Sequence, residues 1–410
     1  MQTSLAEFIR DTPQGREADS ILRACVHCGF CNATCPTYQL LGDELDGPRG
    51  RIYLIKQMLE GAAPTEKTRL HLDRCLTCRA CETTCPSGVR YGRLADIGRD
   101  LVEKRVARGF IDGAIRTLLR TVLPNPALFN PLLKLGQLAR PLLPEKIRRK
   151  IPRAAQPTRW PAAQHARRML LLEGCVQPAL APNINAATAR VLDRLGISLA
   201  RAPGCCGAIT YHLNYQKQGL AIMRRNIDAW WPQIEKGAEA LVINASGCGA
   251  TVKEYGHLLK DDAAYAAKAQ CISALAKDVS EIIVGNKDRI AAQTKKSGVN
   301  TRLAFHAPCT LQHALEIHGV VEPLLADLGF ELADVPDAHL CCGSAGTYSL
   351  LQPELSRKLL ANKIAALESG KPKEILTANI GCLAHLQSAT DLPVRHWIEA
   401  LDELLAVRSP

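Results

Sequence analysis

Apolar positions between residues 46 and 74 recur with the spacing of amphipathic helices. Asp46-Gly47-Pro48 places a proline in the first turn of a helix, and Gly61 follows its last apolar positions. The apolar residues between them are Ile52, Leu54, Ile55, Met58 and Leu59. A second helical segment is expected from about residue 66 to residue 74. The N-terminal region is therefore predicted to be all-helical.

From about residue 168 the pattern changes to short apolar runs that alternate with helical segments. The runs lie at residues 169–172, 241–243, 303–305 and 375–376, and each has the length of a buried strand. Alternating strands and helices predict an α/β fold, in which ligands usually bind at the carboxyl ends of the strands. Candidate chemistry in this half is therefore sought just after each run.

The C-terminal half contains an internal duplication. A cysteine closely follows each apolar run, and the interval from Cys175 to Cys309 equals the interval from Cys248 to Cys382. The segments Cys-Cys-Gly at 205–207 and at 341–343 are separated by almost the same interval. Such self-similarity indicates two copies of one structural unit. Each copy is expected to bring four thiols together.

Composition sets the context for these cysteines. The chain has 410 residues, a formal net charge of +11 and 47% hydrophobic residues, which suits a folded protein of several domains. No run approaches the length of a membrane-spanning helix, and the N-terminus lacks the pattern of a signal peptide. We therefore expect the chain in the cytoplasm, where thiols stay reduced. Its 17 cysteines are then candidate ligands or redox groups.

Two copies of one cysteine motif precede residue 90. Their spacing is Cys-x2-Cys-x2-Cys-x3-Cys-Pro, beginning at Cys25 and at Cys75. In bacterial ferredoxins with this run, three cysteines hold one 4Fe–4S cluster and the fourth ligates the other cluster. Structural zinc is the alternative, but it needs only four ligands and not two complete runs. The predicted ligand sets are Cys25, Cys28, Cys31 and Cys85 for one cluster, and Cys75, Cys78, Cys81 and Cys35 for the second.

Three interpretations of the thiols in the duplicated half stay open. They could bind a further cluster or another metal, form a redox-active disulfide, or be reduced thiols that pack as small hydrophobic groups. Cys271 lies outside the duplication and is interpreted as structural. The candidate additional cluster ligands or redox thiols are Cys175, Cys205, Cys206, Cys248, Cys309, Cys341, Cys342 and Cys382.

A helical two-cluster ferredoxin followed by two Cys-Cys-Gly repeats resembles the family of glycolate oxidase iron–sulfur subunits. The resemblance covers about residues 15 to 400, and the segments at 47–51 (GPRGR) and 306–313 (HAPCTLQH) point most narrowly to this family. The repeats are also similar to those of heterodisulfide reductase, the C subunit of anaerobic glycerol-3-phosphate dehydrogenase and lactate-utilisation proteins. The resemblance implies an α + α/β fold class: an all-helical ferredoxin domain followed by two α/β cysteine-rich (CCG) domains.

The resemblance implies an electron-transfer subunit of a flavin-dependent oxidoreductase that converts glycolate to glyoxylate, with D-lactate as a further candidate substrate. The chain has no G-x-G-x-x-G after a strand and no P-loop, so FAD is expected on partner subunits. The implied partners are an FAD-binding catalytic subunit and a second FAD-binding subunit. Electrons would run from FAD through two 4Fe–4S clusters, and through any cluster in the repeats, toward quinone or another acceptor.

Two alternative functions remain at this point. An electron-transfer subunit for glycerol 3-phosphate or lactate would share these features, because the flavin subunit selects the substrate. A heterodisulfide-reductase-like thiol/disulfide catalytic subunit is disfavoured. That enzyme has a fifth cysteine in each repeat, and Ala245 and Asn379 occupy its place here.

The expected domains are a helical ferredoxin domain (1–115), a basic Pro/Leu-rich linker (116–167) and two CCG domains (168–295 and 296–410). Residues 121–168 contain ten Lys/Arg and a single acid, Glu145. This segment either packs its leucines on both flanking domains or lies on anionic lipid as a leucine-rich basic surface. The second interpretation would place the complex peripherally on the cytoplasmic side of the inner membrane. Nucleic-acid binding is not expected, because stacking aromatics and a binding motif are missing.

Three histidines lie near the cysteines of the second repeat. His306 and His313 flank its first cysteine, and His339 shortly precedes its Cys-Cys pair. Each is either a ligand or proton relay, or a histidine satisfied by backbone groups, and none is assigned as a ligand. Three arginines near the ferredoxin cysteines are expected on a solvated or partner-facing surface: Arg79, Arg90 and Arg93.

Overall fold

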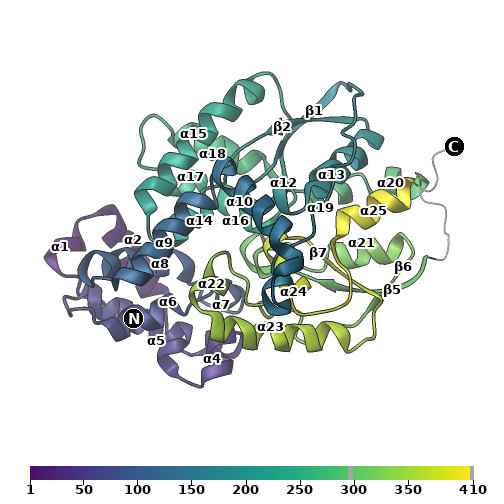
Figure 1. Ribbon diagram of the computed structural model, residues 1–410. Helices are drawn as coiled ribbons and strands as arrows, with labels where there is room; N and C mark the ends of the chain where they lie inside the picture. The colour runs from purple at the N-terminus through teal and green to yellow at the C-terminus, as the bar shows by residue number, and fades with distance from the viewer. Residues whose placement is uncertain (294–298, 407–410) are drawn as a thin grey trace.

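A computed structural model describes residues 1–293 and 299–406. The helical N-terminal region (purple to blue in Figure 1) lies at one end of the molecule, beside two units that contain the sheets. The N-terminal helices are α1 (Glu7–Arg10), α2 (Pro13–Ala24), α3 (Phe30–Ala33), α4 (Pro36–Leu41), η1 (Glu44–Asp46), α5 (Pro48–Leu59), α6 (Glu66–Asp73), α7 (Ala80–Thr83) and α8 (Tyr91–Arg105).

Both helices expected from the apolar pattern are present. Pro48 opens α5, where the missing N–H of proline is not needed, and the helix ends at Leu59. Thr65 and Thr68 form a capping box that starts α6. The apolar faces of α2, α5 and α8 meet in one core, which includes the fully buried Leu22, Ile55 and Leu94.

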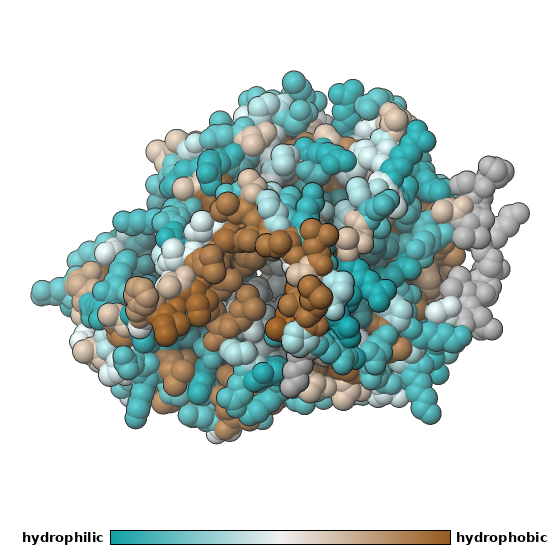
Figure 2. Space-filling model, viewed as in Figure 1, coloured by the Kyte–Doolittle hydropathy of each residue, from teal (hydrophilic) through white to brown (hydrophobic). Residues whose placement is uncertain are grey.

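The basic, proline-rich segment begins with helices and continues without regular structure from residue 149 to residue 166. The expected boundary between residues 115 and 116 falls inside α9, which follows a break between helices at residues 106–109. Apolar side chains gather in a band across the face where Figure 1 draws α9 and α10 (Figure 2). The helices of the segment are α9 (Phe110–Val122), α10 (Pro126–Ala139), η2 (Arg140–Leu142) and α11 (Glu145–Arg148).

Each repeat contains a four-stranded parallel sheet, ordered β2-β1-β3-β4 in the first and β6-β5-β7-β8 in the second. The predicted fold class is therefore confirmed. The apolar runs of the sequence correspond to the central strands β1, β3, β5 and β7. The strands are β1 (Arg167–Leu172), β2 (Ile197–Ala202), β3 (Leu241–Ile243), β4 (Ala276–Asp278), β5 (Val299–His306), β6 (Phe330–Ala333), β7 (Glu374–Thr377) and β8 (Val394–His396).

Helices cover both sheets, and the expected boundary between residues 295 and 296 lies outside the described residues. The first repeat has α12 (Gln177–Leu180), α13 (Pro182–Arg194), α14 (Ala208–His212), α15 (Gln216–Glu235), α16 (Ser246–Lys253), α17 (Tyr255–Leu258), α18 (Ala266–Leu275), α19 (Val279–Val284) and α20 (Lys287–Gln293). The second has η3 (Thr310–Ala314), α21 (Val321–Asp327), α22 (Tyr348–Leu351), α23 (Pro353–Glu368), α24 (Ile380–Gln387) and α25 (Trp397–Ala406).

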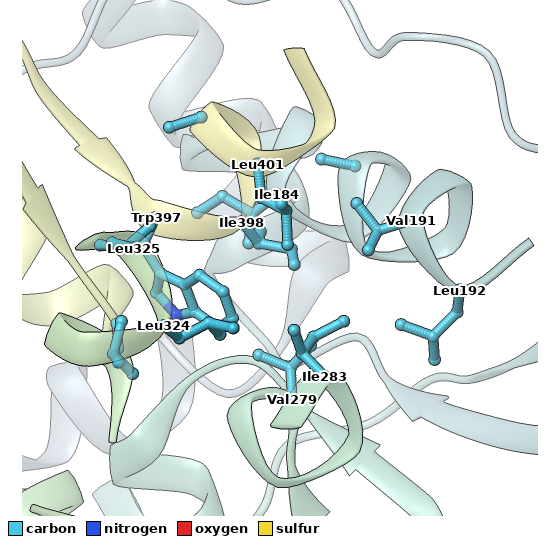
Figure 3. Packing of buried hydrophobic residues seen from close by; sticks show 14 of the residues in the cluster. Ile184, Val191, Leu192, Val279, Ile283, Leu324, Leu325, Trp397, Ile398 and Leu401 are labelled. Carbon is cyan, nitrogen blue, oxygen red and sulfur yellow. The ribbon is translucent and has the colours of Figure 1, made fainter. Parts of the chain in front are cut away.

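The two repeats share one hydrophobic core. Ile184 of α13 in the first repeat lies beside Ile398 and Leu401 of α25 in the second (Figure 3). Arg190 and Asp402 join the same two helices by an ion pair of 2.5 Å. The two repeats therefore pack directly against each other and are not separated by a linker. Among the described residues, no helix is both long and apolar enough to cross a bilayer.

The N-terminal region docks on the first repeat through charged groups. Arg79 and Arg93 both pair with Glu254, at 2.8 Å and 3.1 Å, and Glu17 pairs with His257 at 2.8 Å. The expectation that these arginines face solvent or a partner is thus wrong for Arg79 and Arg93, which join two parts of one chain. A sequence pattern cannot distinguish such an internal surface from an external one.

Candidate metal centres

The first group of thiols surrounds a small cavity at the end of the helical region. His27 (φ 59°) and Gly29 (φ 89°) turn the backbone through left-handed conformations, which wraps the loop around the cavity. Burial, with the charges of nearby thiols, raises the pKa of Cys31 to about 11. The cysteines of this group that line the cavity are Cys25, Cys28, Cys31 and Cys85, and Cys81, which lines the neighbouring cavity, also borders this one.

The second group repeats this arrangement around a neighbouring cavity. Here Thr77 (φ 55°) and Arg79 (φ 60°) provide the left-handed turns. The fourth cysteine precedes Pro36, which begins α4. The Cys-Pro step therefore directs the chain away while its thiol stays at the cavity. The cysteines that line the cavity are Cys35, Cys75, Cys78 and Cys81.

Both groups fit the donor set of a 4Fe–4S cluster, because each combines three thiols of one loop with the fourth thiol of the other run. The structure therefore brings the cysteines together in the two predicted sets. Although burial raises the pKa of Cys75, the charges of Arg51 and Arg99 lower it overall. These cations favour the thiolate that binds metal.

A buried ionic network supports the second group, and the sequence did not reveal it. Asp46 and Arg51 are almost fully buried and pair with each other, and Arg74 also binds Asp46 at 2.7 Å. Arg51 Nε donates to the carbonyl oxygen of His71 at 2.7 Å, and the Cys35 thiol donates to the carbonyl oxygen of Asp46 at 3.8 Å. A charged residue within a helical pattern normally indicates a solvent-facing position. The available signal was the charged Arg51 among apolar positions of α5.

The two groups differ in what surrounds them. Cys28 is exposed, and its neighbours Val26 and Phe30 are 68% and 61% exposed. Leu76 and Cys78 instead pack in one apolar cluster with thiols of the second repeat. The first group therefore lies at the surface, and the second lies between the helical region and the second repeat.

In the first repeat, four thiols meet at the carboxyl ends of the strands. The thiols of Cys175 and Cys206 donate hydrogen bonds to Cys205 and lower its pKa to about 4. The Cys206 thiol also contacts Cys248. Gly207 N–H approaches the Cys205 sulfur at 3.4 Å. Cys271 lies apart, on α18, and is half-buried.

The second repeat brings its four thiols together through the corresponding contacts between cysteines. The Cys309 thiol donates to Cys341 at 3.7 Å, and Cys342 contacts both Cys341 and Cys382. Asn379 Nδ2 donates to the Cys382 sulfur at 3.4 Å. The structure thus gathers the eight candidate thiols into two groups of four. Asn379 occupies the place of a fifth cysteine and acts as a hydrogen-bond donor there.

The histidines of the second repeat have different environments. His313 bridges Thr83 and the backbone carbonyl of His339, at 3.0 Å and 3.1 Å. His306 Nδ1 pairs with Thr377 Oγ1 at 2.9 Å, while its Nε2 has no hydrogen-bond partner among the described residues. Burial and the charge of Lys363 lower the pKa of His306 to about 3, so its ring is neutral. His313 fits a structural role, and His306 does not have all its polar atoms satisfied.

Comparison with known proteins finds matches in three parts of the chain. Residues 21–89 match the 4Fe-4S dicluster domain, and residues 169–253 and 303–387 each match the Cysteine-rich domain. The chain is 61% identical to the glycolate oxidase iron-sulfur subunit of Escherichia coli (strain K12), over 99% of both chains. A relative from Bacillus subtilis (strain 168), described as a probable glycolate oxidase iron-sulfur subunit, is 31% identical over 88% of both chains. Lactate utilization protein A of Bacillus velezensis is 30% identical over 56% of this chain and 96% of its own length.

Proposed function

This chain belongs to the family of glycolate oxidase iron–sulfur subunits, as its motifs predicted, and on that premise we propose that its complex oxidises glycolate to glyoxylate. The chain is an electron-transfer subunit of an oxidoreductase. The observation that carries the proposal is the pair of four-thiol groups within a chain that is similar to that family along 99% of its length. D-Lactate is a second candidate substrate, which the similarity to lactate utilization protein A favours.

The proposed cluster ligands are the two thiol sets that line the neighbouring cavities. When bound, a 4Fe–4S cluster accepts and releases one electron at a time. The residues around the second set balance its negative charge, because Arg51 and Arg99 are fixed beside Cys75. The repeat thiols are proposed as sites of further centres.

The exposed residues beside Cys28 form the proposed docking face for a flavin-bearing subunit. Val26 and Phe30 present apolar surface there, and Arg49 is paired with Glu44 at its edge. A protein partner that covers this face would approach the first thiol group closely. The second thiol group would then pass electrons inward, toward the second repeat and an acceptor such as quinone.

The domain division is proposed with the expected ranges, 1–115, 116–167, 168–295 and 296–410. α9 joins the first two of these regions. Arg108 and Arg116, one just before α9 and one on it, both pair with Asp73 of the helical region. Arg120 of α9 stacks on Tyr215 of the first repeat. This segment thus contacts both flanking regions through arginines, while many of its leucines stay exposed.

The leucine-rich face of α9, α10 and the turns after them is the proposed contact with a membrane (Figure 2). Lys134, Arg140 and Arg148 lie along the same stretch of chain, and basic residues beside exposed leucines favour anionic lipid. The complex would then lie peripherally on the cytoplasmic side of the inner membrane. The exposed apolar residues of this segment are Phe110, Ile111, Ile115, Leu118, Leu128, Leu132, Leu135, Leu138, Leu142 and Ile147.

The electron-transfer proposal is tested in the assembled complex with Cys28→Ser and Cys78→Ser. Each variant should lose about four irons per chain and lower acceptor reduction by glycolate at least about 100-fold, while flavin reduction by glycolate persists. Cys271→Ser is the matched control, because it lies outside both thiol groups. Full turnover in both cluster variants would contradict the proposal.

The membrane proposal is tested by flotation with vesicles that contain or lack anionic lipid. Leu135→Glu and Leu138→Glu together should remove the wild-type binding to anionic vesicles, because each introduces charge on the leucine-rich face. If the double variant instead fails to assemble with the flavin subunits and vesicle binding is unchanged, the face contacts a protein.

A further inference from the structure

Three buried side chains of the second repeat form a compact group of metal-binding atoms. His306 stands at the end of β5, Cys342 in the loop that follows β6, and Cys382 on α24. Their ligand atoms lie within 4.8 Å of one another, and each residue is at most 5% exposed. The group therefore joins three separate elements at the carboxyl end of one sheet.

The two ring nitrogens of His306 have different surroundings. Its Nδ1 is fixed by Thr377 Oγ1 on the neighbouring strand at 2.9 Å. Its Nε2 is buried and has no hydrogen-bond partner in the part of the chain that the structure describes. Leaving such a buried polar atom unsatisfied destabilises the fold. Metal-binding histidines are typically oriented in this way by a bond to the other ring nitrogen.

The spacing of the three atoms fits a single ion. Zn²⁺ holds nitrogen and sulfur ligands at about 2.0–2.3 Å, so its ligand atoms lie roughly 4 Å apart. A 4Fe–4S cluster places each thiolate on a different iron and so spreads its ligands more widely. One imidazole with two thiolates is also a donor set that suits zinc. Asn379 Nδ2 already donates to one of these sulfurs, that of Cys382, at 3.4 Å.

The first repeat lacks the nitrogen donor. By the interval that relates the duplicated cysteines, Leu172 at the end of β1 corresponds to His306, and Ile243 at the end of β3 corresponds to Thr377. Neither the ligand nor the residue that orients it is present there. The thiols are duplicated, but the mixed nitrogen and sulfur set belongs to the second repeat.

We propose that the second repeat binds one zinc-class divalent cation through His306 Nε2 and the thiolates of Cys342 and Cys382. Cys341, whose thiol contacts Cys342, would complete a tetrahedron. The ion clamps β5, the Cys-Cys-Gly loop and α24 together. Cys341 also packs in the apolar cluster that contains Cys78, so the clamp lies beneath the second ferredoxin loop.

The test measures zinc, iron and sulfide per full-length chain, purified without oxygen from medium that contains zinc. The wild type should contain about one zinc besides the iron of its clusters. His306→Leu, which copies Leu172 of the first repeat, should lower zinc at least about tenfold and leave the cubane EPR signals unchanged. His306→Cys should retain the ion, because it restores a ligand. Leu172→Ala is the matched variant in the other repeat. It truncates a buried core residue and should lower the stability of that repeat, but the zinc content should be unchanged.

Zinc X-ray absorption of the wild type gives a readout that needs no variant. One nitrogen at about 2.0 Å with sulfur at about 2.3 Å is expected. Zinc coordinated by sulfur alone, or zinc that His306→Leu leaves in place, would overturn the assignment of His306. Iron and sulfide in place of zinc, or no metal beyond the ferredoxin clusters, would overturn the single-ion site. Each of these outcomes leaves the proposed glycolate function untouched.

Discussion

The two repeats have the same topology and the same thiol positions, but different surroundings. Both sheets are parallel with matching strand order. Gly207 and Gly343, which follow the Cys-Cys pairs, have φ angles of 91° and 87°. This backbone conformation favours glycine and lets each loop turn closely around its thiols. The duplication has therefore preserved the geometry that gathers four sulfurs.

The surroundings of those sulfurs have diverged. In the first repeat, Asn226 donates to the Cys205 carbonyl and Tyr255 to that of Cys206, so the neighbours are neutral. In the second repeat, the buried Lys363 and His306 lie near the thiols. The second repeat also contacts the loop of the second ferredoxin thiol group. The same scaffold thus supports two chemically distinct centres, and changing matched residues tests that difference.

The largest expected difference is in stability. Gly343→Ala would place a Cβ 2.8 Å from Ser356 O and 2.9 Å from Leu359 Cβ, whereas at Gly207 the nearest atom, Gly219 O, lies at 3.3 Å. Both variants incur about 1–2 kcal/mol of left-handed strain. Overlap should add about 2 kcal/mol only in Gly343→Ala. Hydrogen exchange of β1 and β5 amides measures both free energies of opening. Equal losses would show that the two loops are packed alike.

The next difference concerns electron transfer. Cys309 lies in the apolar cluster that contains Cys78, while its counterpart Cys175 contacts Cys205 within the first repeat. Cys309→Ala should slow electron delivery to the acceptor at least about tenfold, or about 1.4 kcal/mol in barrier, and Cys175→Ala less than about twofold. Stopped-flow reduction of the acceptor by the glycolate-reduced complex measures both. A larger effect of Cys175→Ala than of Cys309→Ala would show that electrons pass through the first repeat instead of the second. Cys271→Ala serves as the control.

The features that the two repeats share were easier to predict from the sequence than the surroundings in which they differ. The central strands were predictable because they are continuous apolar runs, such as residues 169–172. The edge strands β2, β4, β6 and β8 were all missed. Two of them, β4 (Ala276–Asp278) and β8 (Val394–His396), are short and carry charged or polar residues. A strand of three mixed residues gives no periodic signal.

The thiol sets were predictable from spacing, because ligands within one loop are close in sequence. The buried pair of Asp46 and Arg51 was not, because their burial depends on helices from other parts of the chain. The position of the His306 ring likewise depends on Thr377, which bonds its Nδ1 and lies far along the chain on a different strand. Long-range packing of this kind leaves no local pattern in the sequence.

The smallest predicted difference is in pH dependence, and it has opposite signs in the two repeats. Asp278 caps α19 after β4, and His396 Nδ1 caps α25 after β8 by accepting from Ile398 N–H. Burial raises the pKa of Asp278 from 3.8 to about 6, and burial lowers the pKa of His396 from 6.5 to about 3. Two equivalent caps therefore titrate in opposite directions.

Between pH 7 and pH 5 the folded first repeat takes up a proton at Asp278 that the unfolded chain does not, so its stability should rise on acidification. Over the same range the unfolded chain protonates His396 while the folded chain does not, so the second repeat should lose stability. Each effect is on the order of 1 kcal/mol. Hydrogen exchange in α19 and α25, corrected for intrinsic rates, measures both. Asp278→Asn should abolish the gain and His396→Asn the loss, since asparagine can still cap a helix. If the two helices respond to acid with the same sign and the variants leave that response unchanged, the repeats do not differ in this respect.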